Sequence, residues 1–179
     1  MTHAAEPDGT ISPSAGRGIG IIIGALFGIA WLYNALKFDH APDWIFYVAY
    51  AATAVIVLGG VMRIRADRKL GLKQPGSTRI AFLIVFAIEI AAIIAALIVL
   101  SRFHMEQYMV AAIAVIVGLH FLPLAKIFRV QIYYVMGLAM VAATAAAAVS
   151  LTGAQQIICI AYSAGAILLV TAFGGMMRR

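Results

Sequence analysis

The sequence predicts an all-α protein with six membrane-spanning helices in a single domain. Composition is the first reason: 64% of the 179 residues are hydrophobic and 11% are charged, whereas a soluble domain carries about 25% charged residues. A chain with so few polar groups cannot cover a water-facing surface, so lipid has to be its solvent. The spacing of the apolar runs and the distribution of the basic residues give the second and third reasons.

Six apolar segments follow one another along the chain. Each is about 20 residues long, which is the length that a helix needs to cross a bilayer. Unpaired backbone groups are too costly in hydrocarbon, so each segment is expected to be helical. None of them alternates polar and apolar residues as a strand of a membrane barrel would. The expected spans are 18–36, 44–62, 80–100, 108–128, 132–151 and 156–176.

The N-terminal stretch, residues 1–16, differs from the rest of the chain. Its residues are small, polar and turn-forming, and we expect a disordered cytoplasmic tail. It lacks the basic start of a signal peptide, and the apolar run after Arg17 is too long for the apolar core of one, so no cleavage is expected. Residues 17–179 are then the single transmembrane domain.

Basic residues predict the orientation of the six spans. The connection between the second and third spans, residues 63–79, holds six of them. The connection between the fourth and fifth spans and the two termini hold five more on that side. The opposite side has only Lys37 and Arg102. Lysine and arginine accumulate in cytoplasmic loops, so both termini are predicted to be cytoplasmic, in a bacterial cytoplasmic (inner) membrane. The net charge of +6 is explained by this topology and by anionic lipid at the basic loop, without nucleic acid as a partner.

Two ionisable residues lie inside the predicted spans. Glu89 stands midway along the third span and His120 stands in the fourth. A charged group at the centre of a membrane helix costs about 2.5–3.5 kcal/mol on insertion scales, so such residues normally face the bundle interior and mark a pathway or a partner. The depths of the two residues differ by about 1–2 Å. Helices joined by a short loop pack side by side, so we expect Glu89 and His120 to meet.

Pro123 places a third polar group at this depth. Proline has no N–H, so the carbonyl of Leu119 loses its helical partner one residue before His120. A carboxylate, an imidazole and a free carbonyl at one level are suited to hold a proton, a small cation or a water molecule. The candidate intramembrane site therefore comprises Glu89, His120, Pro123 and Leu119.

This intramembrane site has three interpretations. The pair can be a hydrogen bond that only locks two helices together, with Pro123 as a kink. It can instead lie on a proton or solute pathway. As a cofactor or metal site it has too few ligands, because zinc takes three or four protein ligands and a bis-histidine haem needs a second histidine in the membrane. We therefore expect no cofactor and no metal.

Further polar residues lie toward the predicted outer face. His40 and His104 are in the outer loops with acidic neighbours, and they are either ordinary solvated residues or an exposed metal cluster. Asn34 and Tyr162 are in the outer halves of their spans and are candidates to line an external vestibule.

The first span carries glycines at intervals of four residues. They form one smooth stripe, where another backbone can approach closely. The stripe either packs inside the bundle or forms a contact between two copies of the chain. Its members are Gly16, Gly20, Gly24 and Gly28.

A motif in the fourth span carries a family resemblance. The segment GLHFLPLAKIFRVQIYY, from Gly118 to Tyr134, resembles a motif in a family of small uncharacterised bacterial integral membrane proteins. The resemblance covers the fourth and fifth spans and implies that His120 and Pro123 belong to one recognisable unit. It implies no activity, substrate or cofactor.

Two functions agree with these observations. The first is a small proton-linked transporter or channel-like protein in which Glu89 and His120 titrate. The second is a non-catalytic membrane subunit or scaffold that binds lipid or a partner. A water-reachable cavity at the pair would favour the first and a dry, closed pair the second. We expect no enzyme, because the sequence shows no nucleophile with its base, no phosphate loop and no pair of catalytic carboxylates.

Overall fold

The computed structural model describes residues 17–69, 76–128 and 130–177. In these ranges the chain forms α1 (Arg17–Phe38), α2 (Asp43–Lys69), α3 (Gly76–Arg102), the short 3-10 helix η1 (Glu106–Tyr108), α4 (Met109–Phe128), α5 (Ile132–Ser150) and α6 (Gly153–Met177). Six of the described helices are long and apolar enough to cross a membrane. The all-α prediction is therefore confirmed, and the predicted tail of residues 1–16 lies outside the described residues.

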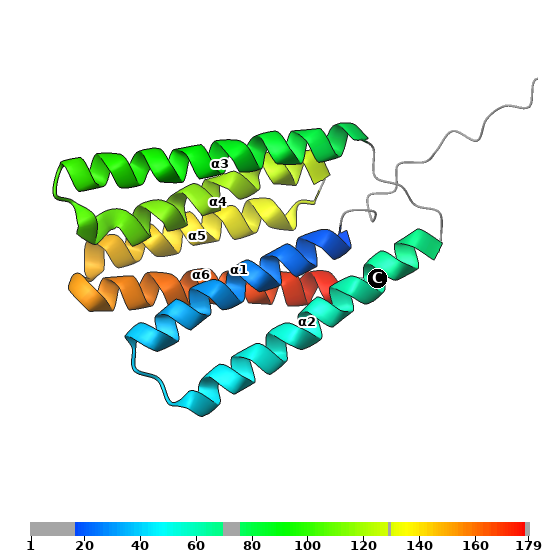
Figure 1. The fold of residues 1–179 in the computed structure, drawn as a ribbon, viewed down its shortest axis with the longest axis horizontal. Helices are drawn as coiled ribbons and strands as arrows, with labels where there is room; N and C mark the ends of the chain where they lie inside the picture. The colour runs from blue at the N-terminus through cyan, green and yellow to red at the C-terminus, as the bar shows by residue number, and fades with distance from the viewer. Residues whose placement is uncertain (1–16, 70–75, 129, 178–179) are drawn as a thin grey trace, which may run out of the picture.

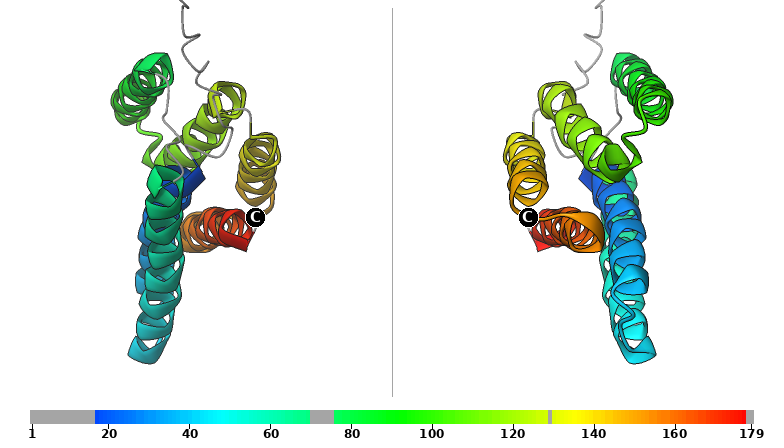
Figure 2. Two further views of the ribbon diagram at one scale, coloured as in Figure 1. Left: turned by 90° about the vertical axis from the view of Figure 1, so that its right-hand side faces the viewer. Right: turned by 90° about the vertical axis from the view of Figure 1, so that its left-hand side faces the viewer.

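The six long helices form a curved row. α1 packs mainly against α6 and α2, α4 lies between α3 and α5, and α5 also packs against α6. The order in space is therefore α3, α4, α5, α6, α1, α2 (Figure 1). Figure 2 shows α3 and α2 at the two ends of this row. Helices that follow one another in the chain are thus neighbours, except at the passage from α2 to α3.

The connections alternate between the two ends of the bundle. The α1–α2, α3–α4 and α5–α6 turns lie at one end, shown at the left of Figure 1. The end of α2, the start of α3, the end of α4 and the start of α5 lie at the other end, together with the start of α1 and the end of α6. The described basic side chains are therefore concentrated at the second end, as the sequence predicts.

α1 and α3 end in the same way. His40 has a φ of 51° and His104 a φ of 54°, both in the left-handed region. After α1, the N–H of Ala41 donates to the carbonyl of Leu36 at 2.9 Å, and the equivalent bond after α3 is 2.8 Å. This is the Schellman arrangement, which satisfies carbonyls at the last turn of a helix. Each histidine is therefore the residue at which the chain leaves its helix.

The basic stretch after the second span is the main difference from the predicted boundaries. The sequence predicts that the helix ends at residue 62, but α2 continues to Lys69, and α3 likewise begins inside the predicted loop. Arg63 Nε lies 3.9 Å from Asp67 Oδ1, one turn later. Such a pair at i and i+4 supports a helix that extends into water. Charge alone therefore marks the end of the membrane span and not the end of the helix.

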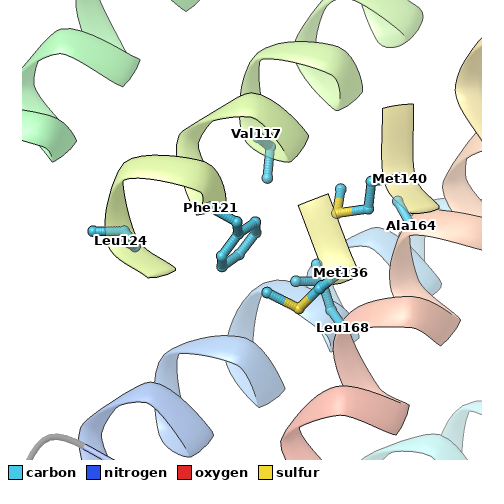
Figure 3. Packing of buried hydrophobic residues seen from close by; sticks show 7 residues of the cluster. All are labelled: Val117, Phe121, Leu124, Met136, Met140, Ala164 and Leu168. Carbon is cyan, nitrogen blue, oxygen red and sulfur yellow. The ribbon is translucent and has the colours of Figure 1, made fainter. Parts of the chain in front are cut away.

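The main core lies where α4, α5 and α6 meet. Figure 3 shows Phe121 of α4 and Met136 of α5 turned toward the same space, next to Leu168 of α6. Burial of such side chains contributes about 1.5–3 kcal/mol each in water-soluble proteins, and in lipid the same packing acts through van der Waals contact. The buried members of this cluster are Val117, Phe121, Leu124, Met136, Met140, Ala164 and Leu168.

Candidate functional site

Glu89 is the one buried residue of α3 among residues 80–102, whose side chains the structure describes. It keeps 6% of its surface exposed, while both of its neighbours in the chain are exposed. α3 lies at one end of the row and packs mainly against α4. The acidic residue therefore occupies the narrow strip of α3 that faces the rest of the protein.

His120 of α4 meets Glu89 across this contact. Its Nδ1 atom lies 3.3 Å from Glu89 Oε2, and the two side chains are 8% and 5% exposed, respectively. The imidazole also interacts with the backbone of Val85, one turn before Glu89 on α3. The ring of Phe121 lies against it edge-on, with the ring centroids 5.7 Å apart. The expected meeting of the two ionisable residues is therefore present in the structure.

The pair is close but not aligned as a hydrogen bond. Within the described residues, Nδ1 of His120 is buried and has no hydrogen-bond partner. A small rotation of the imidazole or of the carboxylate would bring the N–H and the oxygen into line. Chemically, the arrangement can share one proton between an acid and an imidazole, or it can hold two helices together.

The motif around His120 serves two contacts at once. Gly118, two residues earlier, faces Gly137 of α5: a Cβ added to Gly118 would lie 3.0 Å from the Gly137 carbonyl oxygen, and one added to Gly137 would collide with the Gly118 carbonyl oxygen. The backbones of α4 and α5 therefore touch at these two glycines. α4 thus presents a glycine to α5 and a histidine to α3 within a single turn.

Leu119 and Pro123 lie on a different face of α4. Leu119 is 48% exposed and Pro123 is also exposed, whereas His120 points into the α3–α4 contact. Residues four apart share one helical face, which is turned about 100° from that of the next residue. α4 continues as a helix through Pro123 to Phe128. The structure thus brings Glu89 and His120 together and leaves the side chains of Leu119 and Pro123 outside the pair.

Among the described residues, two cavities stand out, and neither is lined by Glu89 or His120. The larger has a volume of about 700 Å³ and is bounded by residues of α1, α3, α4, α5 and α6. The smaller has about 290 Å³ and lies between α1, α4 and α6. Of the two observations that distinguish the candidate functions, this geometry is nearer to the closed pair.

The comparisons with known proteins give a family and no activity. A model described as a family of unknown function (DUF7010) matches residues 69–178, which is more than half of the chain. The chain belongs to this family. No curated protein and no solved structure matches it.

The region that matches the DUF7010 model includes the Glu89–His120 pair. Residues 69–178 take in α3 to α6, and therefore Glu89, His120, Gly118 and Gly137. α1 and nearly all of α2 precede the matched region. The match agrees with the expected membership of an uncharacterised family, while the motif itself and the bacterial origin remain predictions.

The glycine stripe of α1 packs inside the chain. Gly20 faces α5, and Gly24 and Gly28 face α6, while Gly16 lies outside the described residues. A Cβ added to Gly165 of α6 would lie 3.0 Å from the Gly28 carbonyl oxygen, so the two backbones are nearly in contact. Of the two interpretations of the stripe, this is packing within one bundle. These described glycines are therefore already occupied by helices of their own chain.

Asn34 and Tyr162 lie at the same end of the bundle but do not share one chamber. Asn34 Nδ2 donates to the Ala30 carbonyl at 2.8 Å and lines the smaller cavity, which is mostly apolar. The Tyr162 hydroxyl donates to Asp39 Oδ2 at 2.9 Å, next to the α1–α2 turn. The predicted vestibule is thus divided between an apolar cavity and an exposed hydrogen bond that ties this turn to α6.

His40 and His104 are positioned by their backbones. Each ends a helix in the left-handed conformation, as described above, and the two lie in different turns. Among the residues that the structure describes, no three histidine, cysteine or acidic side chains are grouped as metal ligands. The shape of the turns accounts for both histidines at these positions.

Tyr133 lies in the bundle interior, which its position near a span end does not predict. Its hydroxyl lies directly over Gly20, where a Cβ would collide with it, and its ring forms part of the larger cavity wall. α1 and α5 are far apart in the sequence, and a tyrosine near a span end is typical of a membrane interface. The only sequence signal is Gly20 itself, because a glycine leaves room for a bulky side chain from another helix.

Proposed function

We propose that this DUF7010 protein is a non-catalytic membrane protein that binds lipid or a protein partner, and that Glu89 and His120 hold α3 against α4. The burial of the pair is the observation that supports this proposal. The side chains of Glu89 and His120 are 5% and 8% exposed, respectively, and neither lines either of the two cavities. An ionisable residue on a proton or ion pathway needs contact with a water-filled cavity or with a chain of further titratable groups. A buried acid that touches only a neighbouring helix instead fixes where that helix sits.

The proposed orientation has both termini in the cytoplasm of a bacterial cell, with the helices crossing its cytoplasmic membrane. The positions of the connections support it, because the described basic residues Arg63, Arg65, Arg68, Lys69 and Lys126 lie at the end where the chain passes from α2 to α3 and from α4 to α5. Lys37 and Arg102 lie at the opposite end. This asymmetry is typical of cytoplasmic ends.

The extension of α2 beyond the membrane is the proposed lipid contact on the surface. It carries four basic residues and one acid, Asp67, which pairs with Arg63. Basic segments next to a span attract anionic head groups by about 1 kcal/mol per charge. The extension would therefore rest on the cytoplasmic leaflet.

A second candidate function is proton-linked transport through the pair. The observation that favours it is the His120 Nδ1 atom, which is buried 3.3 Å from Glu89 Oε2 and makes no hydrogen bond within the described residues. A pair that is close but unaligned can rearrange when a proton arrives. In this case α3 would have to move to admit water.

Proton flux into liposomes separates the two candidates. The wild-type protein and Glu89→Gln are reconstituted at equal density, with empty liposomes as the baseline and a proton ionophore as the positive control. The proposal of a non-catalytic binding protein expects both proteins to match the baseline. Flux in the wild type that disappears in Glu89→Gln would instead establish the pair as a transport site.

A further inference from the structure

We propose that the larger cavity holds an acyl chain of an anionic phospholipid, whose head group lies at the end of the bundle that carries most of the basic residues. This inference rests on the proposed function, since it names the lipid and the place where the protein holds it. The cavity lies on the inner side of the curved row of helices. It is lined by both α1 and α3, which stand in opposite halves of that row.

The size and lining of the cavity fit a hydrocarbon chain. Its volume of about 700 Å³ lies within the range of roughly 300–1,000 Å³ that is usual for small-molecule sites. The wall is formed by aliphatic and aromatic side chains and by glycines of α1 and α6, with few polar groups. Between helices long enough to cross a membrane, the surrounding medium is lipid, so an acyl chain is the apolar molecule that can enter.

The position of the cavity along the helices argues for a lipid whose head group is anionic. Its lining comes from the first turns of α1 and α5 and from the last turns of α4 and α6, so the cavity lies in the half of the bundle near the basic end. Lys126 is exposed in the last turn of α4. Positive charge at such a mouth attracts anionic head groups.

Tyr133 supplies a polar anchor at the cavity wall. Its hydroxyl lies against Gly20 of α1 and makes no hydrogen bond to a residue that the structure describes. Thr171 also lines the cavity, but its hydroxyl donates to the Ile167 carbonyl at 2.7 Å. A phenolic O–H can donate to an ester or phosphate oxygen, which would fix the chain's depth.

α3 forms one side wall and is the least embedded part of the boundary. Phe82 and Leu83 line the cavity from the start of this helix, about two turns before Glu89. Only 6% of the most apolar stretch of α3 is buried. The Glu89–His120 contact therefore holds a wall of the cavity in place. α1 and α3 both line the cavity but pack mainly against other helices, so a lipid chain would enter from the bilayer between these two helices.

The test is crosslinking from inside the cavity. Full-length protein is reconstituted in liposomes that contain a phosphatidylglycerol with a photoreactive diazirine in one acyl chain, or the phosphatidylcholine of the same chain. After illumination, mass spectrometry locates the labelled residues. We expect labels on the cavity-facing residues of α5 and α6, including Met136, and more label from phosphatidylglycerol than from phosphatidylcholine.

Two filling variants have matched controls on the same helices. A Cβ added to Gly174 meets no atom within 4 Å although the residue lines the cavity, so Gly174→Leu fills it without a clash. Its control is Ala166→Leu, at an exposed position of α6. Leu83→Trp fills the cavity from α3, and Ile84→Trp is its control. Leu83 is 53% exposed and Ile84 is 55% exposed, and only Leu83 lines the cavity.

The outcomes separate this inference from the function on which it rests. We expect both filling variants to lower cavity labelling about tenfold or more, while both controls match the wild type. Unchanged labelling in a filling variant that stays monodisperse and helical overturns the cavity site. Equal labelling by the two lipids overturns the anionic head group. Neither result bears on the proposal that Glu89 holds α3 against α4. Proton flux that depends on Glu89 overturns the proposed function even when the labelling pattern is as expected.

Discussion

The α1–α6 contact and the α3–α4 contact hold the bundle together by different means. In α1, 33% of the most apolar stretch is buried, against 6% in α3. α1 and α6 approach each other through glycines, so closely that a Cβ added to Gly165 would lie 3.0 Å from the Gly28 carbonyl oxygen. α3 instead presents a single buried residue, Glu89, to His120 of α4.

The difference shows two solutions to the same physical problem. In lipid, apolar side chains gain little by leaving their surroundings, so helices associate through close van der Waals packing or through polar contacts. Small residues allow the first solution over a long stretch of α1 and α6. At α3, apolar side chains such as Phe82 pack partly buried against the core, and a single buried polar pair adds the second solution.

The largest effect is expected from Gly165→Leu, which breaks the glycine junction. A Cβ there would lie 3.0 Å from both the Gly28 carbonyl oxygen and the Leu32 nitrogen, which are backbone atoms and cannot turn aside. Overpacking usually costs about 1–3 kcal/mol, and we expect the upper end, about 3 kcal/mol, in the free energy of unfolding. SDS-induced unfolding in mixed micelles measures it. Gly174→Leu on the same helix has open space and should remain near the wild type; equal losses in the two variants would refute close backbone packing as the cause.

A smaller effect is expected from Glu89→Met, which breaks the polar junction. The change takes the acidic neighbour from the buried Nδ1 atom of His120, and an unsatisfied buried polar group costs about 1–3 kcal/mol. The double variant Glu89→Met with His120→Leu should recover to within about 1 kcal/mol of the wild type, because both partners of the contact are then apolar. The same unfolding assay provides the double-mutant cycle. Additive losses would mean that the two side chains do not act as a unit.

The smallest effect is expected from Tyr162→Phe, at the outer end of the bundle. The change removes only the exposed hydrogen bond to Asp39, which is 2.9 Å long. Such a bond contributes about 0.5–1.5 kcal/mol, and exposure places this one at the lower end. Tyr47→Phe, at a side chain that is 72% exposed, is the matched control. A loss as large as that of Glu89→Met would show that the outer hydrogen bond, and not the buried pair, is the more important polar contact.

The sequence predicts the helices and the buried pair well, and the helix ends and side-chain directions less well. The number and type of the helices follow from six apolar runs of the right length, and the meeting of Glu89 with His120 follows from equal depth on helices joined by a short turn. The end of α2 does not follow, because a basic stretch that leaves the membrane can still be helical when Arg63 and Asp67 are one turn apart. Leu119 and Pro123 join the predicted site through the carbonyl that Pro123 leaves without a helical partner, which stays a prediction. The turn of the helix places their side chains away from the pair.

The sequence by itself predicted lipid as the solvent of this chain, and it determined six helices long and apolar enough to cross a membrane, with one acid and one histidine at matching levels. These properties depend on composition and on spacing along single segments, which local chemistry decides. Only the tertiary structure decided which face each helix presents: that the glycines of α1 meet α6, that Gly118 meets Gly137, and that Tyr133 closes over Gly20 beside a cavity. Those contacts join segments that are distant in the chain. In lipid both faces of a helix are apolar, so the sequence shows no apolar stripe that would identify its inner face.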